Sequence, residues 1–386
     1  MDKKSIIGFI LMAVVLLAYT FWIESNQPEI QTPPPASDKQ ISLEDKKTDT
    51  VEPKVKAIDS TALFFNALGE HAPELVSIEN EKLLIEISTK GGEIANVYLK
   101  EKENGSDKFK YQNYSDFNEK ANKPLHLYKK ENARMIFTLD TKEGHLNTNE
   151  YTFEAVNKTD TSVVMRLKDG MKTFDICYQL RPNNYLVDFE IKTSGLDKDI
   201  SSATNFIKLN WHNKVSQLEK RFKFENQYST LTYKLTNDGT EKLSEFEAEK
   251  EVEFESTVDW IAFKNQYFSS ILIAEVPLKV QDVESTPLQE NTSYLKEYHA
   301  NAQASFDPSG QSPTRFQMYF GPNQFRLLQT MDQYAIGGEK DLELEEIVYL
   351  GWPLFKWINR WFTLYVFDFL TQLGLPMGIV LLLITL

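Results

Sequence analysis

The sequence predicts a mainly β protein in which a large antiparallel β-sandwich lies between two apolar ends. Short apolar runs with period-2 alternation fill the middle of the chain, and an uncharged apolar run lies near each terminus. Phenylalanine (25 residues) and tyrosine (17 residues) are frequent, which favours strands because aromatic rings pack well on a pleated surface. Many short strands separated by turn signals are typical of a sandwich.

The first apolar run, Ile6–Ile23, predicts a transmembrane signal anchor over residues 1–24. It carries no charge and approaches the about 20 residues that a helix needs to cross a bilayer. Because Lys3 and Lys4 precede it, the positive-inside tendency places the N-terminus in the cytoplasm. A cleaved signal peptide is the alternative, but the end of the run lacks the small residues of a cleavage site.

Residues 25–75 are expected to form a disordered linker. Prolines alternate there with charged and small polar residues, so the segment buries too little apolar surface to offset the entropy of ordering. The four charges of residues 1–24 cancel, so the net charge of -14 lies in the remainder of the chain. A chain this acidic is unsuited to nucleic-acid binding, and we expect no nucleic-acid partner.

Residues 76–349 are predicted to form the sandwich, and the clearest element is a β-hairpin over Thr173–Ser194. Two alternating runs flank the turn Arg181–Asn184 and place apolar residues on one face. Those residues are Phe174, Ile176, Tyr178, Leu180, Tyr185, Val187, Phe189 and Ile191. Cys177 falls on the opposite face and is expected to be an ordinary strand residue.

Other strands are expected from the same alternation, together with turns and one short helix. The strand ranges are Leu83–Thr89, Arg134–Asp140, Tyr151–Val156, Val163–Lys168, Thr230–Leu235, Ser270–Glu275 and Thr314–Phe320. Gly91–Gly92 and Asn237–Gly239 predict tight turns with positive φ. The helix is expected over Asn323–Tyr334, closed by Gly337 and Gly338.

Residues 350–371 predict an amphipathic helix at the membrane interface. Aromatic rings and cations suit the headgroup region, where rings stay partly hydrated and cations meet phosphates. The predicted membrane-interface residues are Trp352, Phe355, Lys356, Trp357, Arg360 and Trp361. A core helix packed on the sandwich is the alternative.

Residues 372–386 are uncharged but shorter than a membrane span. We expect them to begin a second transmembrane helix that is cut short at Leu386. A re-entrant segment is the alternative.

No sequence pattern predicts catalysis, a cofactor or a metal site. The chain has no Gly-rich phosphate loop, no G-x-S-x-G, no H-E-x-x-H and no C-x-x-C. Its five histidines lack metal-ligand spacing, and Ser293–Lys296 matches S-x-x-K without the companion motifs. We therefore expect a protein that is not an enzyme and that binds no cofactor.

Four strings resemble the YidC-type membrane protein insertases of Gram-negative bacteria. They are Thr89–Ile94 (TKGGEI), Val258–Ser269 (VDWIAFKNQYFS), Met318–Pro322 (MYFGP) and Gly351–Asn359 (GWPLFKWIN). The residues that carry the resemblance are Gly91, Gly92, Trp260, Tyr267, Phe268, Tyr319, Phe320, Gly321, Pro322 and Pro353. Their order along the chain, after an N-terminal anchor and before a second apolar run, makes the resemblance specific.

The resemblance implies an insertase and chaperone of the bacterial inner membrane, with its large domain in the periplasm. It implies that this domain is a mutarotase-like super-sandwich. Its implied partners are nascent membrane proteins, the Sec translocon and the lipid bilayer. The family's groove arginine would lie beyond Leu386, so most of the insertase core is expected to be missing from this chain.

Two other functions stay open from the sequence. A membrane-anchored periplasmic protein that binds or modifies carbohydrate would need a concave face with clustered aromatics and paired carboxylates. A tethered periplasmic chaperone or scaffold would bind unfolded clients without further membrane spans.

Overall fold

The computed structural model describes residues 72–103, 106–109, 124–142, 144–201, 203–338, 340–351 and 353–385. The chain divides into two units, Met1–Ile58 and Asp59–Leu386, and every described residue belongs to the second unit. The predicted anchor (1–24) and nearly all of the predicted linker (25–75) therefore lie outside the described residues.

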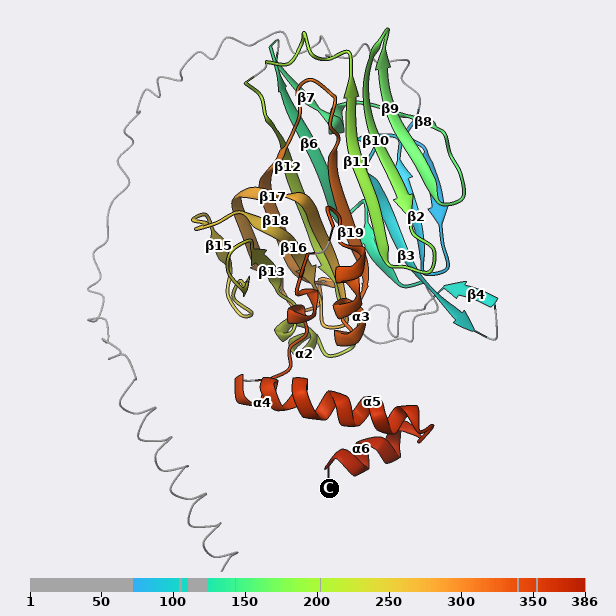
Figure 1. The fold of residues 1–386 in the computed structure, drawn as a ribbon, viewed down its shortest axis with the longest axis vertical. Helices are drawn as coiled ribbons and strands as arrows, with labels where there is room; N and C mark the ends of the chain where they lie inside the picture. Colours follow the sequence, from blue (N-terminus) through green and yellow to red (C-terminus); the bar gives the residue numbers. More distant parts are fainter. Residues whose placement is uncertain are drawn as a thin grey trace, which may run out of the picture. The chain divides into compact units, whose positions relative to one another are not determined.

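A small antiparallel sheet is built from the first described strands (Figure 1). Its order is β1-β2-β3-β4, with β5 beside β3. The bounds are β1 (Leu75–Glu79), β2 (Leu83–Ser88), β3 (Ile94–Glu103), β4 (Ser106–Phe109) and β5 (His126–Lys129). Along β2, buried Leu83, Ile85 and Ile87 alternate with half-buried Leu84 and Glu86, so this sheet turns one apolar face to the core.

A second antiparallel sheet holds 14 strands of the described chain. Its main path runs β7-β6-β12-β18-β17-β19-β11-β10-β9-β8, and β13 to β16 join it through β17. The first strands are β6 (Ala133–Thr141), β7 (Gly144–Asn147), β8 (Glu154–Val156), β9 (Ser162–Asp169), β10 (Lys172–Leu180), β11 (Leu186–Ser194) and β12 (Phe206–Ser216). The later strands are β13 (Leu231–Leu235), β14 (Thr240–Lys242), β15 (Glu249–Glu251), β16 (Val258–Lys264), β17 (Phe268–Pro287), β18 (Tyr294–Ser305) and β19 (Thr314–Pro322).

The 20-residue strand β17 belongs to two parts of this sheet. Its first part pairs with β16 and β19, and its second part pairs with β15 and β18, with an irregularity in the β18 pairing between Val280 and Asp282. An irregularity of this kind bends a strand and increases its twist. The sheet folds back far enough for Phe263 of β16 to stack on Trp211 of β12, with ring centroids 3.8 Å apart.

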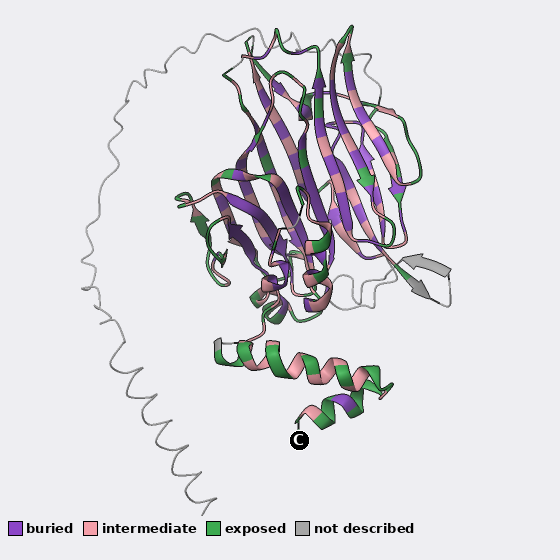
Figure 2. Ribbon diagram, in the orientation of Figure 1, coloured by how far each residue is buried: buried purple, intermediate pink, exposed green. Residues whose placement is uncertain are grey.

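The two sheets enclose a common apolar core. Buried residues of the small sheet, such as Ile85, and of the large sheet, such as Ile176, belong to one cluster. Tyr128 of β5 meets the edge of Phe320 of β19 across it, with ring centroids 5.7 Å apart. Figure 2 shows buried positions alternating with half-buried and exposed ones along most strands. This arrangement confirms the predicted mainly β fold and the antiparallel sandwich.

The predicted hairpin is present as β10 and β11. The two strands pair antiparallel from Thr173↔Ser194 to Leu180↔Val187. Phe174 and Ile176 are buried, as predicted. The prediction of a single buried face is wrong at Leu186, which is 1% exposed on the opposite face because a second apolar cluster covers it there.

Most other predicted strands are present with somewhat different ends, and two differ more. Tyr151–Val156 yields only β8, because Thr148–Glu150 forms a 3-10 helix (η1) and the Tyr151 amide donates to the Thr148 carbonyl. Ser270–Glu275 is one part of the much longer β17.

One of the two predicted tight turns has the predicted backbone. Gly91 and Gly92 have φ of +85° and +63°. The expectation of positive φ is wrong for Asn237–Gly239, where β13 and β14 are joined without it.

Helical segments are concentrated after the last strand. The expected helix over Asn323–Tyr334 is present as α3 (Phe325–Gln329) and η2 (Thr330–Tyr334), followed by η3 (Leu344–Ile347). A continuous helical run then comprises α4 (Pro353–Ile358), η4 (Asn359–Thr363, of π type) and α5 (Leu364–Gln372). The last helix is α6 (Met377–Thr385), and a short α2 (Phe222–Gln227) follows β12. Among the described residues, no helix combines the length and apolarity that a membrane crossing requires.

Candidate functional site

A second apolar cluster, here called the outer cluster, holds the segment after β19 against the large sheet. Trp260 donates its indole N–H to the Leu342 carbonyl at 2.7 Å, which ties β16 to that segment. The cluster is formed by Leu186, Trp260, Ala262, Ile271, Ile273, Tyr319, Leu328, Met331, Leu342, Leu344 and Ile347. The outer cluster covers one face of these strands and the main core covers the other, so both faces are closely packed. The segment that carries α3, η2 and η3 therefore packs on a rigid part of the sheet.

Several residues of the predicted family strings lie in or beside this cluster. Trp260 and Tyr319 are fully buried in it, and the Tyr319 hydroxyl donates to the Pro322 carbonyl at 2.7 Å. A Cβ at Gly321 would lie 2.6 Å from that hydroxyl oxygen, so glycine leaves room for the tyrosine ring. Phe320, on the other side of the strand, is buried in the main core. This string therefore joins the two clusters.

The other family-string residues have different surroundings. Gly91 and Gly92 make the turn between β2 and β3, and the Tyr178 hydroxyl donates to the Gly92 carbonyl at 2.9 Å. Tyr267 is 46% exposed, and Phe268, which begins β17, is half-buried against the main core. Pro353 is the first residue of α4, a position that suits proline because the first helical N–H needs no partner. Trp352 lies outside the described residues.

Charged side chains connect the helical run 353–372 to the rest of the fold; we call these contacts the polar joint. Arg326 of α3 donates to Asp368 of α5, with Nη2 2.8 Å and Nε 2.9 Å from Oδ2, and lies over the Tyr365 ring at 4.7 Å. Arg360 contacts Glu345 at 3.1 Å and Glu346 at 2.8 Å. Lys356 also pairs with Glu346. The helical run is thus joined to α3 and to η3 by ion pairs.

The polar joint gives Lys356 and Arg360 protein partners that the sequence did not predict. Both were predicted to meet lipid phosphates, and in the structure both contact carboxylates of η3. Glu345, Glu346, Arg326 and Asp368 were missed. A weak signal existed, because the acidic string Glu343–Glu346 shortly precedes the cations of the helix.

The acidic side of the polar joint also carries a carboxyl group with an altered pKa. Burial raises the pKa of Asp332 to about 6, the amide of Leu342 that donates to it opposes this, and nearby Asp341, Glu345 and Glu343 add to the rise. Asp332 is in η2 and accepts this hydrogen bond from the segment that bears Glu345 and Glu346. Docking of this segment therefore places several carboxyl groups close together.

The helical run exposes large apolar side chains. Phe355, Trp357 and Trp361 of the predicted interface set are 58%, 64% and 60% exposed. Other exposed residues of the run are Leu354, Phe362, Tyr365 and Phe369. Figure 2 shows α4 and α5 without a buried stretch, and no residue described from Leu354 to Gln372 is classed as buried. A core helix buries one face, so this alternative finds no support in the exposure of the run.

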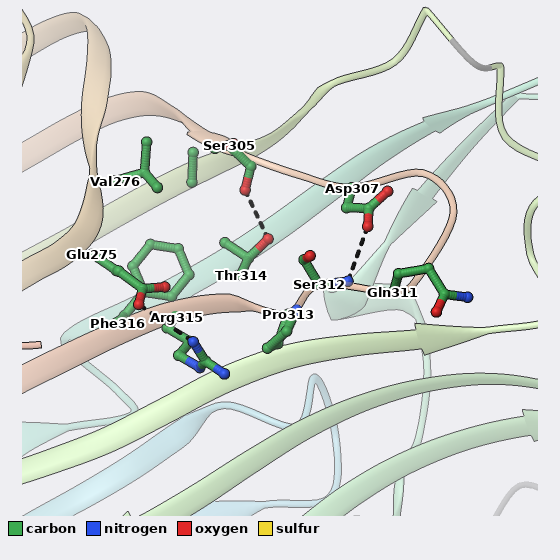
Figure 3. A pocket seen from close by; sticks show the side chains of 11 residues that line it. Glu275, Val276, Ser305, Asp307, Gln311, Ser312, Pro313, Thr314, Arg315 and Phe316 are labelled. Carbon is green, nitrogen blue, oxygen red and sulfur yellow. Dashed lines mark hydrogen bonds and ion pairs between the residues drawn. The ribbon is translucent and has the colours of Figure 1, made fainter. Parts of the chain in front are cut away.

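One pocket that a carbohydrate could enter lies beside β19 and has a volume of about 420 Å³ (Figure 3). Its carboxylates are occupied, because Glu275 pairs with Arg315 at 3.3 Å and Asp307 accepts from the amides of Ser309 and Ser312. The one aromatic residue lining it, Phe316, is 0% exposed. Neither clustered aromatics nor a free carboxylate pair is present in this pocket.

A second pocket, of about 500 Å³, lies over β9, β10 and β11 and includes Cys177. Burial raises the pKa of the Cys177 thiol to about 11. A thiol with this pKa stays protonated near neutral pH and is a poor nucleophile. The structure thus agrees with the expectation that Cys177 is an ordinary strand residue.

The family model of the YidC periplasmic domain matches residues 75–365, from the start of β1 into α5. The chain belongs to this family. It is 38% identical to the membrane protein insertase YidC of Bacteroides fragilis strain YCH46 and 36% identical to that of Phocaeicola vulgatus. Each alignment covers 100% of this chain, which spans 61% and 60% of the length of these relatives.

The solved structures that match the chain are far more distant in sequence. A galactose mutarotase related enzyme from Lactobacillus acidophilus matches with a TM-score of 0.37 and 13% identity, over 64% of this chain and 97% of the other. A galactose mutarotase-like protein from Lactobacillus casei matches with a TM-score of 0.36 and 11% identity, over 64% and 100%. Likeness at this level does not bear on function.

Proposed function

We propose that this chain is the N-terminal part of a membrane protein insertase and folding chaperone. Its clients are nascent membrane proteins, which it serves alone or together with the Sec translocon, and it makes or breaks no covalent bonds. The observation that carries the proposal is the family match over residues 75–365, together with relatives named insertases that align with the whole chain. We place the protein in the bacterial inner membrane, with the N-terminus in the cytoplasm and the sandwich in the periplasm.

Within this proposal, residues 350–371 form the surface that contacts the bilayer. Exposed indole rings, such as those of Trp357 and Trp361, are favourable at the headgroup level because one edge stays hydrated while the ring is buried. Large apolar side chains gathered on one short helical run are costly in water and mark a contact surface. The lipid bilayer is the contact that suits a helix flanked by further apolar sequence at Met377–Thr385.

The polar joint supports this proposal by fixing the side of the helix that faces the sandwich. Arg360 and Lys356 are drawn towards η3 by Glu346, and Asp368 is drawn towards α3 by Arg326. The charged side chains Lys356, Arg360 and Asp368 thereby contact other parts of the protein. The exposed aromatic side chains remain available to contact the membrane.

Spin labelling of the full chain in liposomes tests the membrane contact. A nitroxide at Trp361→Cys, in a Cys177→Ser background, is compared with one at Phe246→Cys, an aromatic residue of similar exposure (69%) located between β14 and β15. We expect the label at 361 to collide mainly with oxygen, which concentrates in lipid, and the label at 246 mainly with a water-soluble nickel chelate. Equal access of the chelate to both labels would exclude the proposed contact.

Depletion of the protein in its host tests the insertase role. We expect newly made inner-membrane proteins to remain accessible to protease as uninserted chains. Re-expression of residues 1–386 alone is expected not to restore insertion, because the insertase relatives are longer. Normal insertion after depletion, or rescue by residues 1–386, would contradict the proposal.

A further inference from the structure

Three side chains with metal-binding atoms come together on the surface of the large sheet. His212 Nε2 lies 2.8 Å from Glu297 Oε1, and His299 Nε2 lies 3.4 Å from the same oxygen. One ligand atom from each residue can be chosen so that all lie within 4.8 Å of one another. The imidazole rings stack with centroids 4.4 Å apart.

Pairing of β12 with β18 accounts for this arrangement. His212 lies directly opposite His299 in the register, and Glu297 is two residues before His299 on the same face. Opposite residues of antiparallel strands have Cβ atoms about 5 Å apart, and a diagonal neighbour is within reach of a long side chain. The spacing is therefore set by the backbone pairing.

The opposite face of these strands makes the arrangement rigid. Trp211, Tyr298 and Ala300 alternate with the three polar residues and are buried in the main core. β12 and β18 each have a strand on their other side, β6 and β17. Little backbone movement is available, so the site needs little reorganisation on binding.

The three side chains remain accessible to solvent. They are 21% (His212), 26% (Glu297) and 36% (His299) exposed, so an ion can reach them without opening the fold. Two imidazole nitrogens and one carboxylate oxygen are a recurrent ligand set for Zn²⁺, and they leave a fourth position for water or an incoming group. Imidazole also suits Cu²⁺ and Ni²⁺.

We propose that His212, Glu297 and His299 form a binding site for a late first-row divalent metal ion, with Zn²⁺ as the representative. The ion lies between β12 and β18 and takes one donor atom from each of the three side chains. It links the two strands on the face away from the core. This site is separate from the proposed insertase role and from the helical run 353–372.

Titration of the full, chelator-treated chain with Zn²⁺ or Co²⁺ tests this site. We expect one equivalent to bind, with Co²⁺ giving the visible absorption of a low-coordinate complex. His212→Ala and His299→Ala should each weaken binding by more than about tenfold, since even loss of an outer partner costs this much at metal sites. His145→Ala is the matched control and should leave the affinity unchanged, because His145 pairs with a single carboxylate of the described residues, Asp140.

A substitution that keeps all three ligands gives a second test. The Lys214 ammonium lies 3.7 Å from Glu297 Oε2 and competes with a cation for that carboxylate. Lys214→Met should therefore tighten Zn²⁺ binding. Zn²⁺ should also raise the thermal unfolding midpoint of the unaltered chain and not that of His299→Ala.

The proposal fails if no equivalent of Zn²⁺ binds, or if the two histidine variants bind as well as the His145 control. It also fails if Lys214→Met weakens binding. These outcomes would mean that the three side chains form only an ion-pair network on the sheet surface.

Discussion

The sandwich and the helical run after it use the same aromatic residues in opposite ways. Trp211 and Trp260 of the sheet are 0% exposed, whereas Trp357 and Trp361 of the helical run are 64% and 60% exposed. The sheet tryptophans contact side chains from distant parts of the sequence. Those of the helix have no covering segment among the described residues.

This difference shows that composition alone does not decide what an aromatic residue does. In the sheet, neighbouring strands and the segment carrying α3 and η3 bury both faces, so aromatic residues stabilise the fold. In the helical run, the contacts with the sandwich are made largely by charged groups, so the rings contribute little to folding stability in water. Mutations can test this contrast directly.

The largest effect is expected when a buried sheet tryptophan is removed. Trp260→Ala creates a cavity in the outer cluster and deprives the Leu342 carbonyl of its donor. We expect a loss of about 3–5 kcal/mol in the free energy of unfolding. Urea denaturation followed by circular dichroism measures it.

The matched control is Trp357→Ala, which should change the free energy of unfolding by no more than about 0.5 kcal/mol. Equal losses in the two variants would remove the contrast between the regions, because the exposed tryptophan would then have to be packed in the folded state.

A smaller effect is expected from a glycine in the small sheet's turn. At Gly92, φ is +63° and an added Cβ would lie 3.1 Å from the Phe153 ring. Gly92→Ala should cost about 1–3 kcal/mol from the left-handed backbone, with crowding of the ring in addition. Thermal unfolding measures the loss.

Gly170→Ala is the control, since φ is +59° there and, apart from the adjacent residues, no described heavy atom lies within 4 Å of the added Cβ. If the two variants lose the same amount of stability, crowding of the Phe153 ring adds nothing to the cost of the substitution at Gly92.

A pH-dependent effect is expected at the base of the polar joint. The pKa of Asp332 is raised from 3.8 to about 6, so its protonated form is favoured in the folded state. This contribution is fully present below pH 3.8 and is lost as the pH rises through about 6. Asp332→Asn, which keeps an oxygen for the Leu342 amide, should gain stability relative to the unaltered chain over that window.

Unfolding by urea at about pH 4 and about pH 7, on either side of the raised pKa, measures this difference. A constant difference between Asp332→Asn and the unaltered chain at both pH values would show that the carboxyl group titrates normally. Comparing the two proteins at each pH removes contributions from other titrating groups.

The smallest effect is expected from an ion pair of the polar joint. The Arg326 and Asp368 side chains are 40% and 35% exposed, so solvent screens their attraction. A double-mutant cycle with Arg326→Gln and Asp368→Asn should give a coupling of about 0.2–1 kcal/mol. A coupling of several kcal/mol would mean that the helical run is an integral part of the sandwich.

Local patterns were sufficient to predict the elements with regular periodicity. The hairpin of β10 and β11 and the helical run after residue 352 were both predicted, because their residues repeat every two or about 3.6 positions. The full 20-residue length of β17 was not predicted, since its second part is mostly polar and only its pairing with β18 and β15 identifies that part as a strand.

Those local patterns could not predict contacts between segments that are distant in the sequence. The polar joint depends on Arg326 meeting Asp368, and the metal site depends on the register that brings His212 opposite His299. Neither pairing leaves a periodic signal in the sequence. The proposed interface residues were chosen for their chemistry, whereas the intramolecular partners of Lys356 and Arg360 could be seen only in the fold.

The strand order of the large sheet affects how the domain can fold while the chain is being made, N-terminus first. The centre of that sheet is made by β17, β18 and β19, whereas β6, β12, β10 and β11 lie to either side. The edges of β12 and β11 that pair with β18 and β19 therefore stay unpaired until the last hundred or so residues have been made. Pairing between strands so far apart in the sequence is slow. During that interval the nascent domain is at its most vulnerable to self-association, so holdase assistance at the exit side would benefit its biogenesis more than its mature stability.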